Sequence, residues 1–293
     1  MSPRDVFLYS TSVLIWGTTW LAITYQLGPA PVEVSVAYRF ALAAALLLAY
    51  CFVRGYPLKF SARDHRFMAL QGLFLFAVNY VLTYHAERFI SSGLTAVGFT
   101  VIVFLNILGT RVFFGNPIRL PVLMGAALGA VGIGLVFWPD LAGFRASPEG
   151  LLGLGLIVSA AAFSSIGNML SAWNQKRRLP VVPSNAFGMA YGALFVAGFA
   201  LFTGKDFPVP LSASYLISLL YLSLFGTALA FGAYLSLLGR IGADKAAYAS
   251  VLFPLVALAL STWVEGFVWH PSTVLGLCLS LVGNIIILSK RRA

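Results

Sequence analysis

Polar and aromatic side chains recur inside long apolar stretches of the sequence. Such side chains are costly in lipid and usually face a cavity or another helix. Trp16 and Trp20 are four residues apart, as are Tyr80 and Tyr84, so each pair shares one face of a helix. Aromatic faces can hold an apolar group, while amides and hydroxyls can hold polar ends. We therefore predict a binding site for an amphipathic solute, lined by Trp16, Trp20, Asn79, Tyr80, Thr83, Tyr84, Thr100, Ser164, Asn168, Phe231, Tyr234 and Tyr248.

These residue types also have structural roles, so a second interpretation stays open for them. Trp and Tyr gather in belts at the membrane interfaces, and Ser and Thr hydroxyls often bond the backbone of their own helix. Asn79 and Asn168 are the stronger candidates, because an amide in hydrocarbon needs hydrogen-bonding partners. The cluster around Tyr80 is favoured as a cavity wall, whereas Trp16 and Trp20 fit a cavity and an interface equally well.

Arg39 is the one basic residue well inside an apolar stretch, roughly 10 Å from its outer end at 1.5 Å per residue. A guanidinium at this depth can clamp a carboxylate solute. The alternative, which we prefer on the sequence, is a structural pair with Glu33, Glu87 or a helix carbonyl. Pro254 lacks an amide donor and is expected to act as a hinge by weakening its helix, with static packing as the alternative.

The sequence contains no arrangement of residues typical of an enzyme. The histidines His65, His85 and His270 are far apart, which argues against a metal site. The sequence also lacks a phosphate-binding glycine loop, so ATP-driven pumping by this chain is not expected. No carboxylate falls at mid-span, so an obvious proton relay is missing and tight proton coupling is not expected. We therefore expect no enzymatic activity, no metal and no cofactor.

The composition requires that the helices carrying these side chains face lipid. Of the 293 residues, 60% are hydrophobic and 10% are charged, and the mean hydropathy is +0.90. A soluble domain carries roughly 25% charged residues, so the outer surface of this fold must contact lipid. The net charge of +10 does not indicate nucleic-acid binding, because the basic residues stand in short runs between apolar stretches, such as Lys176–Arg178.

Apolar stretches of about 17–25 residues can cross the hydrocarbon as helices. The sequence predicts ten: 6–26, 32–53, 67–86, 93–114, 119–138, 150–173, 184–203, 212–238, 244–264 and 272–288. Alternate loops then place most of the 19 Lys and Arg residues on the side that holds both termini. Only Arg88, Arg145 and Lys205 fall on the other side. We therefore expect a multi-pass protein of the cytoplasmic (inner) membrane with both termini in the cytoplasm.

The two halves of the sequence resemble each other at an offset of about 151 residues. Ile90–Gly93 and the span after it resemble Ile241–Asp244 and its span, and Leu123–Gly132 resembles Leu275–Gly283. The units are expected at 1–145 and 146–293, with five spans in each. An odd number of spans gives the second unit the opposite orientation. We predict an all-α integral membrane fold of ten transmembrane helices in two inverted five-helix repeats.

Several short motifs support a family resemblance: Trp16-Gly17-Thr18, Arg39, Ala86 through Ala96, Phe253-Pro254-Leu255 followed by Glu265, and the glycine-rich fifth and tenth spans. In this order they resemble the EamA repeat of the drug/metabolite transporter superfamily, in two copies that cover nearly the whole chain. The first copy departs from the pattern, since Val103 and Phe114 stand near where the second has Pro254 and Glu265. Within the superfamily the chain most resembles the aromatic amino-acid exporters.

The resemblance implies export of aromatic and other amphipathic amino acids, or of similar small metabolites, by alternating access. Drugs or other metabolites of the same superfamily are the alternative substrates, and a membrane protein without transport activity is the remaining alternative. The expected partners are a small solute and membrane lipid, not nucleic acid. Small residues at Gly125–Gly129 and Gly276–Ser280 allow close helix approach within one chain or between two, so a monomer and a homodimer both stay open.

Overall fold

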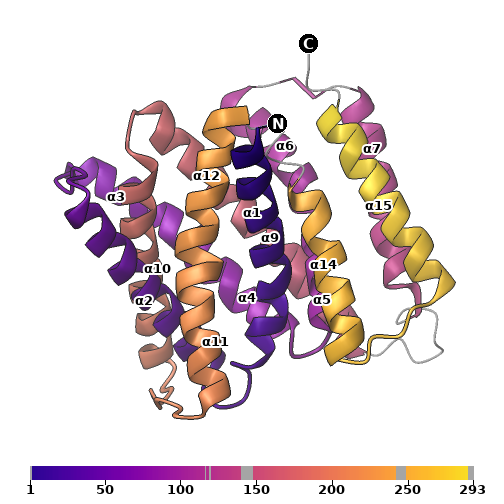
Figure 1. Ribbon diagram of the computed structural model, residues 1–293, viewed down its shortest axis with the longest axis horizontal. Helices are drawn as coiled ribbons and strands as arrows, with labels where there is room; N and C mark the ends of the chain where they lie inside the picture. Colours follow the sequence, from indigo (N-terminus) through magenta and orange to yellow (C-terminus); the bar gives the residue numbers. More distant parts are fainter. Residues whose placement is uncertain (1, 116, 119, 140–147, 242–248, 290–293) are drawn as a thin grey trace.

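The computed structural model describes residues 2–115, 117–118, 120–139, 148–241 and 249–289. This part of the chain folds into helices that pack side by side (Figure 1). In chain order they are α1 (Pro3–Thr24), α2 (Val32–Val53), α3 (Ala62–Gln71), η1 (Gly72–Val78), α4 (Asn79–Ala86), α5 (Ser92–Phe99), α6 (Ile102–Phe114), α7 (Leu120–Val136), α9 (Pro148–Lys176), α10 (Val181–Phe202), α11 (Ala213–Ser223), η2 (Leu224–Leu229), α12 (Ala230–Ile241), α14 (Ala249–Val264) and α15 (Pro271–Ser289). The segments η1 and η2 are π-helical.

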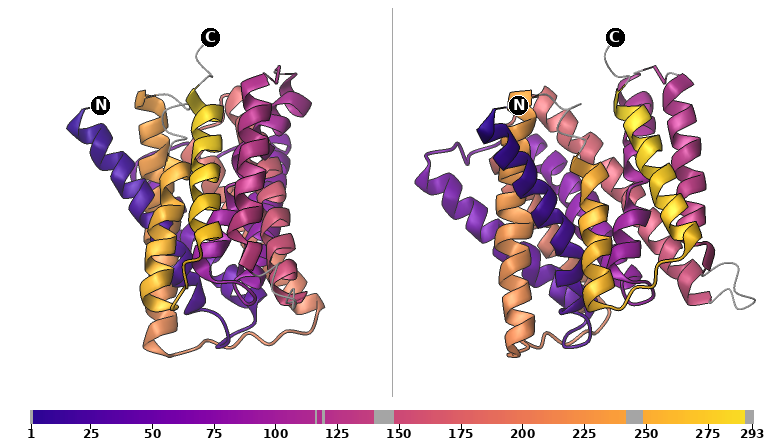
Figure 2. Two further views of the ribbon diagram at one scale, coloured as in Figure 1. Left: turned by 90° about the vertical axis from the view of Figure 1, so that its right-hand side faces the viewer. Right: turned by 45° about the vertical axis from the view of Figure 1, so that its right-hand side comes forward.

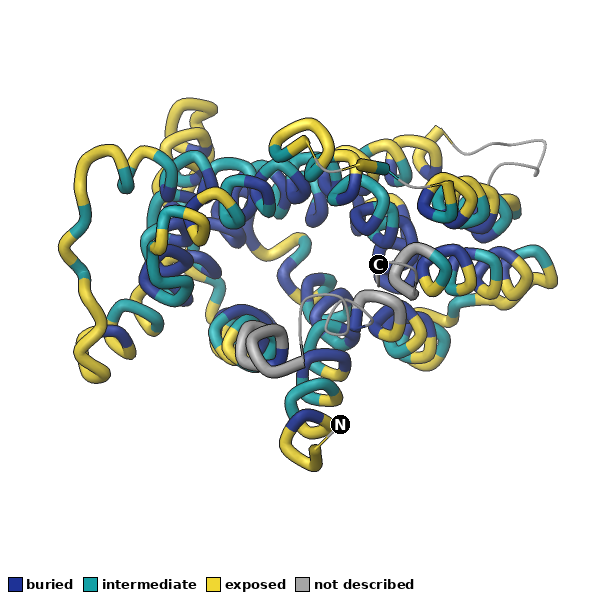
Figure 3. Tube along the Cα trace, turned by 90° about the horizontal axis from the view of Figure 1, so that it is seen from above, coloured by how far each residue is buried: buried dark blue, intermediate teal, exposed yellow. Residues whose placement is uncertain are grey.

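Most of these helices have the length and composition of membrane spans. Seven helical stretches of the described chain are long and apolar enough to cross a membrane: Pro3–Thr24, Val32–Val53, Ala62–Ala86, Ser92–Phe114, Pro148–Lys176, Val181–Phe202 and Ala213–Tyr234. Three shorter apolar helices are Leu120–Val136, Leu252–Val264 and Pro271–Ile286. Exposed residues lie around the outside of the bundle and buried ones on its inner side (Figure 3). The fold is therefore all-helical and suited to lipid, while the count of ten crossings stays a prediction.

Local sequence sets several of the helix ends. Ser2 and Asp5 form a capping box at the start of α1, in which Ser2 N donates to Asp5 Oδ2 at 2.8 Å and Asp5 N donates to Ser2 Oγ at 3.3 Å. Ser61 and Asp64 repeat this arrangement at the start of α3. Gly115 ends α6 in the left-handed conformation, with φ of 73°. These short sequence motifs therefore define where the helices begin and end.

Three predicted spans are interrupted rather than uniform α-helices. The π-helical segment η1 lies between α3 and α4, η2 lies between α11 and α12, and α5 ends one residue before Thr100. A Cβ on Gly72 in η1 would collide with the carbonyl oxygen of Gly188 in α10. One on Gly226 in η2 would lie 2.7 Å from Cγ2 of Thr19 in α1. The π-helical segments therefore lie where a neighbouring helix approaches very closely.

The glycine-rich helices α7 and α15 pack against each other within one chain, at the right of Figure 1. A Cβ on Gly132 would lie 2.5 Å from the carbonyl oxygen of Gly276, and one on Gly283 would lie 2.5 Å from that of Gly125. The register runs in opposite directions along the two helices, so the pair is antiparallel. The Ser280 hydroxyl donates to the carbonyl oxygen of Gly129 at 3.4 Å. The small residues of these two helices thus serve intrachain packing.

Gly132→Ala should destabilise the protein by about 1–3 kcal/mol, because the added methyl meets backbone atoms of α15 that can yield only if the helices separate. Gly134→Ala is the matched control: it lies two residues away on the same helix, and its Cβ would meet nothing within 4 Å. Thermal unfolding of the purified variants in detergent measures the difference. Equal melting temperatures for both variants would show that the α7–α15 contact is looser than described.

The helix α1 begins and α15 ends at the same end of the bundle, which we call the terminal end; the opposite end is the far end (Figures 1 and 2). The connection between α9 and α10 lies at the terminal end, close to the start of α3. An ion pair joins the two places, with Arg177 Nη2 at 2.9 Å from Asp64 Oδ1. The connections from α4 to α5 and from α14 to α15 lie at the far end.

Candidate functional site

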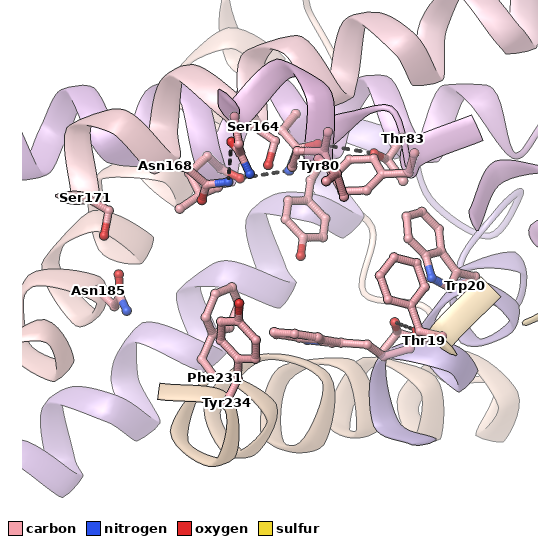
Figure 4. Close-up of a pocket in the computed structure, with 18 of the residues that line it drawn as sticks. Thr19, Trp20, Tyr80, Thr83, Ser164, Asn168, Ser171, Asn185, Phe231 and Tyr234 are labelled. Carbon is pink, nitrogen blue, oxygen red and sulfur yellow. Dashed lines mark hydrogen bonds between the residues drawn. The ribbon is translucent and has the colours of Figure 1, made fainter. Parts of the chain in front are cut away.

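A cavity of about 390 Å³ lies between helices from both halves of the chain (Figure 4). Side chains from α1, α2, η1, α4, α5, α6, α9, α10, α12 and α14 surround it. The lining residues are Trp16, Thr19, Trp20, Ile23, Arg39, Leu75, Asn79, Tyr80, Thr83, Phe99, Ile102, Val103, Asn106, Ile107, Ser164, Asn168, Ser171, Ala172, Gln175, Asn185, Phe231, Tyr234 and Phe253. A volume of this size fits a small metabolite.

One wall of the cavity is polar and is built by α4, α6 and α9 (Figure 4). Asn168 Nδ2 donates to Asn106 Oδ1 at 3.2 Å, which links α9 to α6. The Thr83 hydroxyl donates to Asn79 Oδ1 at 3.5 Å. Asn79 Nδ2 donates to the carbonyl oxygen of Leu75 at 3.0 Å, which satisfies a backbone group of η1. Each amide has further donor or acceptor positions with which to bind a ligand.

The opposite wall is aromatic and is built by α1 and α12 (Figure 4). The ring centroid of Trp16 lies 5.6 Å from that of Phe231 and 5.0 Å from that of Tyr234. Thr19 lies on the same wall, and its hydroxyl donates to the carbonyl oxygen of Trp16 at 2.8 Å, so its polar atom is satisfied by its own helix. A solute between the two walls therefore meets amides and hydroxyls on one side and aromatic rings on the other.

Arg39 places a guanidinium at the cavity, although the residue is only 1% exposed. Its Nη1 donates to the hydroxyl of Tyr84 at 3.3 Å and its Nη2 donates to that of Thr227 at 3.5 Å. The guanidinium carbon lies 4.6 Å from the ring centroid of Tyr80 and 5.5 Å from that of Phe40. All of these partners are neutral, and the two rings add cation–π attraction.

The structural pair expected between Arg39 and an acidic residue is not formed. Glu33 Oε1 lies 3.1 Å from His85 Nε2 instead. Both carboxylate oxygens of Glu87 are buried and have no hydrogen-bond partner among the described residues. Within this part of the chain Arg39 thus has no carboxylate partner. The described residues also include no group of three or more His, Cys, Asp or Glu side chains that could hold a metal ion.

The structure brings most of the predicted site residues together. Those that line the cavity are Trp16, Trp20, Asn79, Tyr80, Thr83, Ser164, Asn168, Phe231 and Tyr234, together with Arg39. Tyr84 does not line it: the side chain is fully buried and donates to Gln26 Oε1 at 2.7 Å. Thr100 is also buried, and its hydroxyl donates to the carbonyl oxygen of Val97 at 2.6 Å. Thr100 therefore bonds its own helix, which was the structural alternative for Thr residues.

Two further predictions concern α14 and the segment before it. Tyr248 lies outside the described residues. Pro254 is buried inside α14, next to Phe253, which lines the cavity. On the neighbouring helix α1, a Cβ on Gly17 would lie 2.5 Å from Cβ of Val256. Pro254 thus stands where α1 and α14 are in tight contact, and its role as a hinge stays a prediction.

Sequence reasoning missed part of the polar lining. The missed polar side chains are Asn106, Ser171, Gln175 and Asn185. A signal for two of them was present, because Ser164, Asn168, Ser171 and Gln175 follow one another at spacings of four, three and four residues. That spacing marks one face of a helix. Asn106 is the one polar lining residue that α6 provides, and Asn185 is the one lining residue that α10 provides, so only the fold brings them to the cavity.

Aromatic rings line the far end of the cavity, and contacts close to them join the two halves of the chain. The ring of Trp20 lies 5.4 Å from Phe99 and 6.0 Å from Phe253, measured between centroids. The carboxylate of Glu265, just after α14, accepts hydrogen bonds from Ser92 N at 3.1 and 3.2 Å and another from the Ser92 hydroxyl. These bonds join the start of α5 to the end of α14. The N-terminus of α5 also stabilises the negative charge of the carboxylate.

Toward the other end, the lining reaches the terminal end of the bundle. Gln175 is the last residue but one of α9, and Asn185 lies in the first turns of α10. Figure 4 shows Asn185 and Ser171 at one end of the cavity and Trp20 at the opposite end. The cavity is thus elongated, and its polar lining continues to the end where α1 begins.

Glu87 lies in the far-end connection after α4 and is only 7% exposed. Burial and the nearby Glu265 raise the pKa of this carboxyl well above its usual range, although Arg39 opposes the shift. The folded protein therefore binds a proton that the unfolded chain releases. The stability that this neutral carboxyl contributes is fully present below the ordinary carboxyl pKa of about 4.3 and is lost as pH rises through the folded value.

Glu87→Gln should therefore raise the melting temperature near neutral pH, because glutamine stays neutral throughout. At about pH 4 it should leave the melting temperature unchanged. Melting of detergent-solubilised protein, followed by Trp fluorescence between about pH 4 and about pH 8, measures this difference. Glu149→Gln, at an exposed position in the first turn of α9, is the control. A gain that does not depend on pH would contradict the assignment.

Known proteins resemble this chain over most of its length. The chain is 22% identical over 287 residues to Protein PagO of Salmonella typhimurium, covering 97% of this chain and 92% of that protein. It is 28% identical over 256 residues to an uncharacterized inner membrane transporter, YedA, of Escherichia coli strain K12, covering 86% and 80%. It is 25% identical over 298 residues to a probable amino-acid metabolite efflux pump of Salmonella typhimurium, covering 99% and 94%.

A solved crystal structure superimposes with a TM-score of 0.69 at 17% sequence identity, covering 96% of this chain and 95% of the other, so the fold is shared. The sequence matches the EamA-like transporter family twice, over residues 4–138 and 151–289. The two matches together cover almost all of the chain, and they meet at the connection between α7 and α9. This chain therefore belongs to the EamA-like transporter family, a group of membrane transporters in the drug/metabolite transporter superfamily.

Proposed function

We propose that this transporter exports small amphipathic metabolites, with aromatic and other apolar amino acids as the favoured class, through the central cavity by alternating access. The observation that carries the proposal is the pairing of a polar wall with an aromatic wall across one cavity of about 390 Å³. Burial of a Phe-sized side chain contributes about 1.5–3 kcal/mol. Such a site binds weakly enough to release its solute after each cycle.

The proposed substrate-binding residues are those that face a solute from both walls. Asn79, Asn168 and Ser164 would hold its polar groups, and Trp16 and Phe231 its apolar part. The probable amino-acid metabolite efflux pump among the relatives supports this substrate class. The relative YedA is described as an uncharacterized transporter without a named solute, so export of drugs or other metabolites is the alternative.

We also propose that the chain forms two inverted units of five membrane-spanning helices, near 1–145 and 146–293. Each unit has a π-helical segment in its third span, at η1 and at η2. Helices α7 and α15, the fifth span of each unit, pack as an antiparallel pair, and its Ser280–Gly129 bond joins residues 151 positions apart. Equivalent helices that meet in opposite directions are expected across a pseudo-two-fold axis in the membrane plane.

The terminal end is proposed to face the cytoplasm. Positively charged residues favour the cytoplasmic side of a membrane, and the ends of α2 and α9 carry Arg54, Lys176 and Arg177. The cavity lining continues toward this end, and Trp20, Phe99 and Phe253 close the far end. The structure would then correspond to an inward-facing state, ready to take up a solute from the cytoplasm.

Efflux from vesicles that contain the purified protein tests the proposed function. The panel of solutes comprises aromatic, aliphatic and charged amino acids, with empty vesicles as the control. We expect phenylalanine, tryptophan and leucine to leave faster than glutamate or lysine. Transport of hydrophobic drugs but of no amino acid would favour the alternative substrate class. A failure to move any solute would contradict the whole proposal.

A further inference from the structure

Arg39 is a buried cation that forms no ion pair with a carboxylate among the described residues. The residue is 1% exposed, and its hydrogen-bond partners are the hydroxyls of Tyr84 and Thr227. The nearest acidic residues form no ion pair with it: Glu33 pairs with His85, and Glu87, whose carboxyl group has no hydrogen-bond partner in the described chain, acts on Arg39 only through space. A buried ion is retained at a considerable energetic cost unless an opposite charge reaches it.

The surroundings of Arg39 orient its guanidinium without saturating it. The Tyr84 hydroxyl donates a hydrogen bond to Gln26 Oε1 at 2.7 Å and accepts one from Arg39 Nη1. The bond to Gln26 therefore fixes the position of the hydroxyl that Arg39 contacts. The ring of Tyr80 lies 4.6 Å from the guanidinium carbon and supports it by cation–π attraction. A guanidinium has five N–H donors, and Nε of Arg39 has no partner in the described chain. Donors therefore remain for a bound anion.

The position of Arg39 within the lining matches an anionic head group joined to an apolar body. Tyr80, which stacks on the guanidinium, reaches from the polar wall into the cavity toward Phe231 and Tyr234 (Figure 4). The described lining residues include no other Lys or Arg and no Asp or Glu. A single positive charge balances one carboxylate, and the uncharged amides and hydroxyls of the polar wall can accept an ammonium group without requiring it.

We infer that Arg39 binds the carboxylate of the transported solute, so that the substrates are amphipathic monocarboxylates, with or without an amino group. This inference rests on the proposed transport function and adds its recognition chemistry. The same inference predicts the order of affinity among related solutes. Phenylalanine and 3-phenylpropionate should bind, because both combine one carboxylate with an aromatic ring. Phenylalaninamide and phenethylamine should bind poorly, because they lack the anion and bring a positive charge close to Arg39.

The test measures binding and efflux of these four solutes in wild-type protein, in Arg39→Gln and Arg39→Lys, and in Arg66→Gln, an exposed arginine of α3. We expect the wild type and Arg66→Gln to prefer the two acids over the two cationic analogues by about 10- to 100-fold. In Arg39→Gln this preference should disappear, and Arg39→Lys should keep only part of it, since lysine lacks the planar fork.

Stability separates recognition from a structural role. If Arg39 serves the solute, Arg39→Gln should melt no lower than the wild type, because it removes an unbalanced buried charge, but added phenylalanine should no longer raise its melting temperature. If the wild type binds and transports phenylalanine and phenylalaninamide equally well, the inference is overturned while the transport function stays in place. This comparison needs no variant. A preference for acids that survives in Arg39→Gln would also overturn it. Failure of the wild type to move any solute would instead contradict the proposed function.

Discussion

Ser171→Trp should abolish efflux while the protein still folds and inserts into the membrane. Ser171 lines the elongated cavity near its terminal end and is only partly buried, so an indole can be placed there by filling the cavity rather than by separating helices. The cavity measures about 390 Å³. An indole at this position would narrow the cavity at the point that a solute has to pass to reach the aromatic wall.

Ser159→Trp provides the matched control, because it makes the same substitution on the same helix at an exposed position. A tryptophan facing lipid should leave both efflux and melting temperature close to those of the wild type. Initial efflux rates from vesicles with equal amounts of protein give the comparison. If Ser171→Trp transports at the rate of Ser159→Trp, the cavity is not the translocation route, whatever the solute.

The positions of the helices were largely predictable, because the length of an apolar run and the Pro or Gly residues beside it act locally. The predicted stretch 32–53 corresponds to α2 (Val32–Val53), and 184–203 overlaps most of α10 (Val181–Phe202). The π-helical segments were not predictable from composition. They occur where Gly72 and Gly226 meet partners on other helices, at Gly188 and Thr19, which are far away in the sequence.

In the candidate site, too, the sequence alone does not predict where single side chains lie. The four-residue spacing of Tyr80 and Tyr84 indicates a shared helix face, but it does not give the depth at which each side chain lies. Tyr80 reaches the cavity, whereas the hydroxyl of Tyr84 is bound by Gln26 in the turn after α1 and by Arg39 of α2. The neutral surroundings of Arg39 were missed for a related reason, since its partner Thr227 is 188 residues away.

Opening of the far end should become easier in Glu265→Gln. The helices α5 and α14 belong to different halves and pack tightly, because a Cβ added at Gly93 would lie 2.9 Å from Ser261 Cβ. For a solute to leave at the far end, these helices must separate and the bonds between Glu265 and Ser92 must break. Glutamine keeps the shape of the side chain but loses the charge and one acceptor oxygen.

Charge-assisted hydrogen bonds contribute about 1.5–3 kcal/mol when buried. Glu265 is exposed, and solvent screening reduces this contribution to about 1–2 kcal/mol. A loss of that size changes the ratio of two states about 5- to 30-fold. The equilibrium in Glu265→Gln should therefore shift by this factor toward the state that is open at the far end, with no change at the cavity itself.

A cysteine at Thr83, in the cavity wall near the far end, reports this shift. The background carries Cys51→Ser and Cys278→Ser, which remove the two native cysteines. A membrane-impermeant thiol reagent added from the far-end side should label the cysteine about 5- to 30-fold faster with Glu265→Gln. Glu149→Gln removes an exposed carboxylate from the first turn of α9 and should leave the rate unchanged. Equal labelling in both variants would mean that Glu265 caps α5 without holding the far end closed, and that the aromatic contacts of Trp20 suffice for closure.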